Sequence, residues 1–123
     1  MKTCMSQVIV YVSDMQKSIH FYRNLLGLKL VSESEQWSEF DGGPFHIALH
    51  WSNLSDDVQG QRVVTAGNAE LVFEVDDLDR ACAEIEQKGG AVDGPQVMEG
   101  LDVRVAFLRD PDGMAIELIE EKG

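Results

Sequence analysis

The chain has 123 residues, 44% hydrophobic and 26% charged, which is the size and composition of one globular domain. Its formal net charge of −12 argues against a nucleic acid or an anionic membrane as partner, because both attract clustered lysine and arginine. No apolar run approaches the roughly 20 residues needed to cross a bilayer, and the N-terminus has no signal-peptide core, so we expect a cytoplasmic protein.

The first half of the chain predicts one helix among four strands. Residues 7–12 are rich in β-branched and aromatic types and predict a strand. Asp14, or Ser13, can cap a helix whose apolar residues recur at helical spacing until Gly27 ends it. Further strands are predicted at 28–32, 35–40 and 45–51, the last two separated by a turn at 41–44.

The second half repeats this order after a polar, turn-rich stretch at 52–67, which we interpret as a linker. A strand is predicted at 69–75, and Asp77 begins a helix that Gly89 and Gly90 end. The remaining strands are predicted at 91–92, 103–108 and 114–119, with a tight turn at 110–113.

The two halves form an internal repeat with a constant offset. The separation of Asp14 from Asp77 equals that of Gly27 from Gly90, so each aspartate precedes its glycine by the same distance along the chain. One helix cannot close a core over four strands alone, so we expect the halves to assemble into a single α+β domain, residues 1–123. Its modules would span 1–58 and 66–121. No glycine-rich phosphate-binding motif is present, so a nucleotide cofactor has no support.

Three segments carry a family resemblance: VSDM at 12–15, SIHFYRNLLG at 18–27 and DPDGMAIEL at 110–118. Together they resemble the vicinal oxygen chelate superfamily, which includes glyoxalase I, bleomycin-resistance proteins and extradiol dioxygenases. The resemblance implies paired βαβββ modules that form an open, cupped β-sheet around a small-molecule cavity, commonly in a homodimer.

The resemblance also implies metal ligands on the first and fourth strands of each module. The first-strand positions fall on Gln7 and Glu70, and their separation is the same as the offset of the repeat. The fourth-strand positions fall on Glu117 and, in the first module, on Ala48, which cannot bind a metal. A glyoxalase I site usually has four ligands and a histidine at position 70, so this set of three oxygen donors differs from it.

The chemistry of Gln7, Glu70 and Glu117 favours Mg²⁺, Mn²⁺ or Ca²⁺ over Zn²⁺, because carboxylate and amide oxygens are hard donors. An ion with open positions can polarise substrate oxygens. Without an ion, Glu70 and Glu117 would repel each other and one would retain its proton. We therefore predict both as catalytic residues, one of which removes a proton beside a carbonyl. The alternative is two polar residues in a wet, metal-free cavity.

Other candidate ligand contacts lie on the strands. Trp37, His50, Trp51 and Arg104 are predicted to bind substrate, although the tryptophans also fit a core or dimer contact and Arg104 fits a surface salt bridge. His46 and His50 share a strand face with Ala48, so one of them can replace the missing ligand if the strand register slips by two residues; otherwise each can line the pocket or lie at the surface.

Two functions remain open. The first is a glyoxalase-like enzyme, a lyase, isomerase or epimerase, that uses a divalent metal in the sheet cavity. The second is a metal-free protein that binds a small molecule or drug, as bleomycin-resistance proteins do, where the acidic balance favours a cationic ligand. Extradiol dioxygenase activity ranks below both, because it needs two histidines and one carboxylate around iron, and neither first-strand position is histidine.

Overall fold

The computed structural model describes residues 2, 5–51, 69–98 and 103–121. The chain separates into two compact units, Met1–Gln61 and Arg62–Gly123, and each is described by itself. The predicted linker lies outside the described residues. The assembly of both units into one domain with a cupped sheet stays a prediction.

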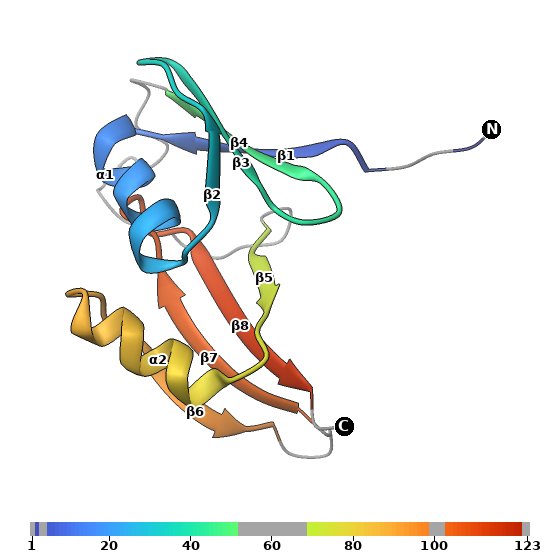
Figure 1. Cartoon of the computed structure of the whole chain (residues 1–123), viewed down its shortest axis with the longest axis vertical. Helices are drawn as coiled ribbons and strands as arrows, with labels where there is room; N and C mark the ends of the chain where they lie inside the picture. The colour runs from blue at the N-terminus through green and yellow to red at the C-terminus, as the bar shows by residue number, and fades with distance from the viewer. Residues whose placement is uncertain (1, 3–4, 52–68, 99–102, 122–123) are drawn as a thin grey trace. The chain divides into compact units, whose positions relative to one another are not determined.

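Each unit contains one helical segment and a four-stranded mixed sheet, which confirms the α+β class and the repeated β-α-β-β-β order (Figure 1). The first and last strands of each unit are parallel neighbours, and the other pairs are antiparallel. Unit 1 contains β1 (Gln7–Val12), α1 (Met15–Ile19), η1 (His20–Leu25), β2 (Lys29–Ser32), β3 (Trp37–Asp41) and β4 (His46–Trp51), in sheet order β1-β4-β3-β2. Unit 2 contains β5 (Leu71–Glu74), α2 (Leu78–Gln87), β6 (Asp93–Val97), β7 (Val103–Arg109) and β8 (Ala115–Glu121), in sheet order β5-β8-β7-β6.

Both predicted helix N-caps are confirmed. The Asp14 carboxylate accepts a hydrogen bond from the backbone N–H of Lys17 at 3.1 Å, and the Asp77 carboxylate accepts one from Arg80 at 3.1 Å. Each bond satisfies an amide in the first turn that has no partner within the helix. The repeated aspartates therefore begin the helix in each unit.

The first helical segment is one position longer than the second. Gly27, which has positive φ, follows the Asp14 cap one position later than Gly89, also with positive φ, follows Asp77. The segment His20–Leu25 is a π-helix, in which the N–H of Leu26 donates to the carbonyl of Phe21. Wider turns accommodate the additional residue. Gly89, rather than the predicted Gly90, is therefore the counterpart of Gly27.

The core of each unit lies between its helix and one sheet face (Figure 1). Alternate strand residues point to that face, as the period of a strand requires. Tyr22 and Phe40 are fully buried there, with ring centroids 6.0 Å apart. In unit 2, Leu78 and Ile85 of α2 are buried, as are Ile116 and Leu118 of β8.

The strand predicted at 91–92 is displaced. The structure forms β6 at Asp93–Val97, and its pairing with β7 shifts between Asp93 and Gln96. This strand contains Pro95, which cannot donate to a neighbouring strand, and it lies at the edge of its sheet. Local propensity disfavours a strand through glycine and proline, so the edge position explains the difference. None of the described helices is long and apolar enough to cross a membrane.

Candidate functional site

The sheet face opposite the helix in unit 1 carries three rows of paired residues, one from each of β1, β4 and β3. Directly paired residues on neighbouring strands point to the same face. We call this surface the helix-free face of unit 1. Its rows are Tyr11, His50 and Trp37; Ile9, Ala48 and Glu39; and Gln7, His46 and Asp41.

The strand register of unit 2 identifies the counterpart of Ala48. Ala48 pairs with Ile9 on the parallel strand, and Glu117 pairs with Val72. Ile9 and Val72 are separated by the same offset as Asp14 and Asp77. Ala48 and Glu117 therefore occupy equivalent places in the two modules, which supports the pairing inferred from the repeat.

Glu70 and Glu117 lie together in unit 2. Glu70 is exposed just before β5, and Glu117 is half-buried on β8. Burial raises the pKa of the Glu117 carboxyl, and the charge and hydrogen bond of Glu70 raise it further. Two carboxyl groups this close favour a state in which one proton is retained. The pair can therefore hold and release a proton, or bind a cation that offsets the repulsion.

The donors of this pair fit a hard divalent cation, because the negative charge of Glu70 disfavours ionisation of Glu117 and a positive ion beside both carboxyl groups offsets that repulsion. No group of three or more His, Cys, Asp or Glu in the described part of the chain is arranged to hold a metal. The predicted ligand set has only two residues of these types, Glu70 and Glu117, together with the side-chain amide of a glutamine. Its third member, Gln7, belongs to unit 1, so its role stays a prediction.

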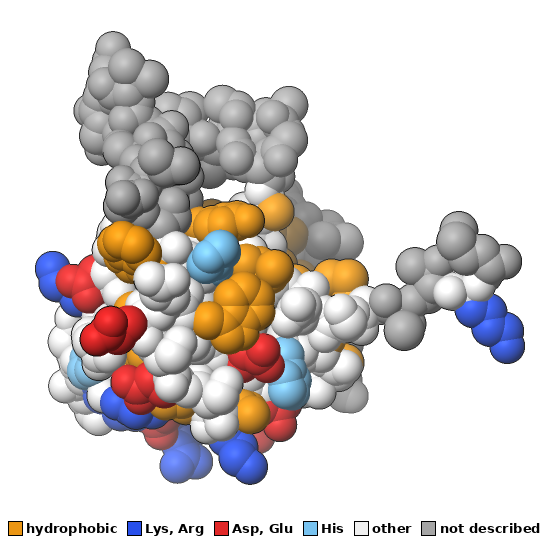
Figure 2. Space-filling view, turned by 90° about the horizontal axis from the view of Figure 1, so that it is seen from above, with side chains coloured by type: hydrophobic (Ala, Val, Ile, Leu, Met, Phe, Trp, Pro, Cys, Tyr) orange, Lys and Arg blue, Asp and Glu red, His pale blue; other side chains and the backbone are white. Residues whose placement is uncertain are grey.

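Three rings lie side by side on the helix-free face of unit 1. The ring centroids of Tyr11 and His50 are 5.3 Å apart, and those of His50 and Trp37 are 5.6 Å apart. Tyr11 is 54% exposed, whereas His50 and Trp37 are half-buried, so this aromatic row reaches solvent at Tyr11. Figure 2 shows hydrophobic side chains gathered beside histidine and acidic side chains on one face of the molecule. Such a surface suits a flat ligand.

Glu39, which was not among the predicted site residues, joins the aromatic row to His46. The indole N–H of Trp37 donates to Oε1 of Glu39 at 2.9 Å, and Nδ1 of His46 lies 3.1 Å from Oε2. The hydrogen bonds from Trp37 and His46 lower the pKa of the Glu39 carboxyl. Alternation along residues 37–41 places Trp37 and Glu39 on one face, so the strand period was a usable signal for this contact.

Trp51 and Arg104 lie on the opposite faces of their sheets from the candidate residues. Trp51 alternates with His50, and its indole N–H donates to the backbone carbonyl of Ser13 at 3.1 Å. Arg104 alternates with Val105, and its guanidinium pairs with Asp79 on α2. These positions favour the structural interpretation of both residues.

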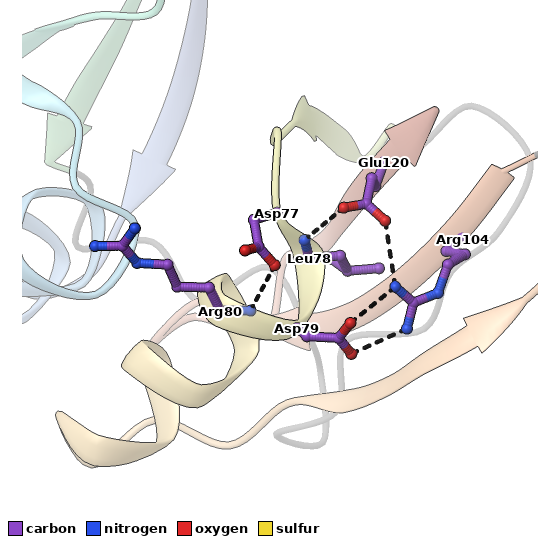
Figure 3. Close-up of polar contacts among 6 residues, drawn as sticks. All are labelled: Asp77, Leu78, Asp79, Arg80, Arg104 and Glu120. Atoms are coloured by element: carbon purple, nitrogen blue, oxygen red, sulfur yellow. Dashed lines mark hydrogen bonds and ion pairs between the residues drawn. The ribbon is translucent and has the colours of Figure 1, made fainter. Parts of the chain in front are cut away.

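The Arg104 guanidinium joins α2 to the last strand (Figure 3). It contacts Asp79 at 3.0 Å and Glu120 at 3.2 Å, and Glu120 also accepts from the backbone N–H of Leu78 at 3.0 Å. The hydrogen bond to Asp79 raises the pKa of Arg104 and lowers that of Asp79. Both groups therefore stay charged while they hold the start of α2 against the sheet.

The family model of the Glyoxalase/Bleomycin resistance protein/Dioxygenase superfamily matches residues 5–118. The chain belongs to this superfamily. It is 35% identical over 128 residues to a lactoylglutathione lyase from Salmonella typhimurium, covering 90% of this chain and 87% of the relative. A lactoylglutathione lyase from Escherichia coli O157:H7 is 34% identical over 126 residues, with the same coverage.

Solved structures with the same fold include an antibiotic binding protein. SMU.1112c matches with a TM-score of 0.81 and 25% identity, covering 96% of this chain and 98% of that chain. TnmS3, an antibiotic binding protein from Streptomyces sp. CB03234, matches with a TM-score of 0.73 and 25% identity, covering 98% of each chain. The fold therefore does not decide between catalysis and binding.

Proposed function

We propose that this protein is a glyoxalase-type enzyme, a lyase, isomerase or epimerase, that acts on a small oxygenated substrate with a divalent metal ion. The observation that carries the proposal is the Glu70–Glu117 pair, in which the pKa of Glu117 is raised beside a second carboxyl group. The identity of 35% to a lactoylglutathione lyase supports it. Perturbed carboxyl pairs are more frequent at functional sites than elsewhere.

Glu70 and Glu117 would hold the ion, with Gln7 as the predicted third ligand from module one. The ion would polarise a substrate carbonyl and make the neighbouring C–H more acidic. Three oxygen donors favour Mg²⁺, Mn²⁺ or Ca²⁺.

Glu117 would move the proton in this reaction. In the metal-free protein the pKa of its carboxyl is raised, which brings its proton exchange nearer to the working pH, where a general base works best. It takes a proton from one substrate carbon and returns it to the neighbouring carbon, or to the other side of the same carbon. Neither transfer needs a redox cofactor, since the proton balance is closed within the substrate.

Thermal unfolding of the chelator-treated protein tests the proposal. Mg²⁺, Mn²⁺, Ca²⁺, Ni²⁺ and Zn²⁺ are added separately to the wild type and to Glu70→Gln and Glu117→Gln. An ion at about 100 times its Kd adds about 2.7 kcal/mol to the free energy of unfolding. The wild-type protein with its ion bound is then assayed for turnover of α-hydroxy and α-keto compounds, including lactoylglutathione.

The matched control is Glu86→Gln, which removes the same charge from an exposed position on α2. We expect this variant to bind the ion as the wild type does, while both site variants lose the stabilisation. Equal stabilisation in all four proteins, or in none, would reject the metal-dependent enzyme.

We propose a metal-free drug-binding protein as the second candidate. The aromatic row of Tyr11, His50 and Trp37 supports this alternative, since aromatic faces attract flat and cationic ligands. The net charge of −12 favours a cation, and the match to the antibiotic binding protein TnmS3 adds support.

Tryptophan fluorescence tests this second candidate with bleomycin as the probe. The chain has two tryptophans, so Trp51→Phe leaves Trp37 as the only reporter. We expect one-to-one quenching that a chelator does not change, and its loss when Tyr11→Ala is added to the Trp51→Phe protein, which keeps Trp37 as the reporter. Quenching that disappears with the chelator, or no quenching, would reject the metal-free binder.

We further propose a homodimer, as the family resemblance implies. Ile9 is 40% exposed and Tyr11 is 54% exposed on the helix-free face of unit 1, and Val72 is 50% exposed in unit 2. Exposed apolar side chains of this kind are common at interfaces between copies. Light scattering during size-exclusion chromatography tests the dimer, and a monomer at all concentrations would reject it.

A further inference from the structure

The two modules carry their carboxylate on different strands of the same row. In unit 2, Glu117 lies on β8 and pairs with Phe107 on β7. In unit 1 the corresponding row has Ala48 on β4 and Glu39 on β3. Ala48 is therefore not simply a lost ligand, because the neighbouring strand supplies a carboxylate to the same face.

Glu39 is held in place by two side-chain contacts, to Trp37 at 2.9 Å and to His46 at 3.1 Å. The indole N–H can only donate, so Glu39 accepts from Trp37 through Oε1. Its second oxygen, Oε2, lies against Nδ1 of His46. A carboxylate there favours the proton on Nδ1, which leaves the lone pair of the neutral imidazole on Nε2.

His46 lies directly beside Gln7 in the sheet. The two residues are direct partners in the parallel pairing of β1 and β4, so their side chains leave the same face on adjacent strands. The His46 side chain is 44% exposed, and no described residue bonds to Nε2. An imidazole nitrogen and an amide oxygen are thus available together.

We propose that Gln7 and His46 form the contribution of module one to divalent cation binding, through Oε1 and Nε2, with Glu39 as the positioning residue. Ligand histidines commonly donate their other ring N–H to a carboxylate, which fixes the ring and strengthens the ligand. The inference rests on the proposed metal-dependent function and names a nitrogen donor in it. A nitrogen donor extends the range of ions toward Zn²⁺ and Ni²⁺.

Nitrogen NMR of the histidine rings tests the inference directly. The chain has three histidines, so single variants assign every ring signal. Zn²⁺ and Mg²⁺ are titrated separately into the full-length, chelator-treated protein. We expect Zn²⁺ to change the Nε2 signal of His46, with those of His20 and His50 changing less. In metal-free protein the His46 signals should indicate a proton on Nδ1.

Two variants separate positioning from folding. Glu39→Gln should shift the tautomer of His46 and weaken Zn²⁺ binding about tenfold, as loss of a carboxylate behind a ligand does. His46→Gln should weaken binding at least as much. His20→Gln is the matched control, because His20 is exposed on the first helix and contacts Asn24. It should bind Zn²⁺ as the wild type does.

The outcomes separate this inference from the proposed function. If the ion binds and is lost in Glu117→Gln, but the His46 signals do not change, the inference fails and the proposed function stands. A change at His50 in place of His46 would also overturn it. If the wild type binds no ion, both fail together.

Discussion

Glu39 and Ala48 face each other directly across β3 and β4, on the face of unit 1 opposite its helix. Ala48 is completely buried, whereas Glu39 is half-buried and held by Trp37 and His46. The carboxylate in this row is therefore on β3, and β4 carries only the small side chain of Ala48. This relationship makes position 48 sensitive to both size and charge.

Ala48→Glu should destabilise unit 1 by about 1–3 kcal/mol, because a larger side chain enters a filled position and a second carboxylate lies opposite Glu39. Adding Glu39→Ala should recover part of this loss by removing the repulsion. Urea unfolding of both single variants and the double variant measures the coupling, which should exceed the error of the three measurements. Purely additive effects would show that the two positions do not interact.

Glu117→Gln should change stability in a pH-dependent way in the chelator-treated protein. Burial and Glu70 raise the pKa of Glu117 above its ordinary value of 4.5 in the folded state. The protonated Glu117 carboxyl therefore makes its full contribution to the free energy of unfolding below about pH 4.5. This contribution is lost as the pH rises through the raised pKa. The amide does not titrate, so the variant should gain stability relative to the wild type between pH 4 and pH 7.

Urea unfolding at pH 4 and pH 7 measures that gain. A saturating divalent ion at pH 7 is the internal control, since it should stabilise the wild type and remove the advantage of the variant. A difference between the two proteins that is the same at both pH values would contradict the raised pKa.

The two helix caps should contribute similarly in both units. Asp14→Ala and Asp77→Ala each remove the acceptor for a backbone N–H in the first turn. We expect each to lower the free energy of unfolding by about 1 kcal/mol. Asp14→Asn and Asp77→Asn keep an acceptor oxygen and should remain close to the wild type. Thermal and urea unfolding compare the four variants, and equal losses for alanine and asparagine would argue against capping.

Leu78 should be the costlier of two apolar truncations in unit 2. Leu78 is fully buried between α2 and the sheet, so Leu78→Ala should cost about 2–5 kcal/mol. Val72→Ala is the control on an exposed strand position, where Val72 is 50% exposed and the cost should be about 0.5 kcal/mol or less. Similar losses for both would show that α2 does not anchor the core.

Glu70 and Glu117 show which features of the candidate site can be predicted from the internal repeat of the sequence. The constant offset between the halves marks Gln7 and Glu70 as counterparts, and the register of the parallel strands agrees by matching Ala48 with Glu117. The sequence predicted that one of the two carboxyl groups retains its proton, but it could not predict that this carboxyl is Glu117. A pKa depends on burial and on the separation of the two carboxyl groups, and neither is a local property.

The sequence by itself determined the features that rest on local chemistry. The capping aspartates, the helix-ending glycines and the alternation of apolar residues follow from backbone conformations and periods that each segment carries. Only the tertiary structure decided that Glu39 lies between Trp37 and His46, that Arg104 pairs with Asp79, and that β6 begins at Asp93. These depend on which strands become neighbours and in what register, and that is set by burial across the whole unit.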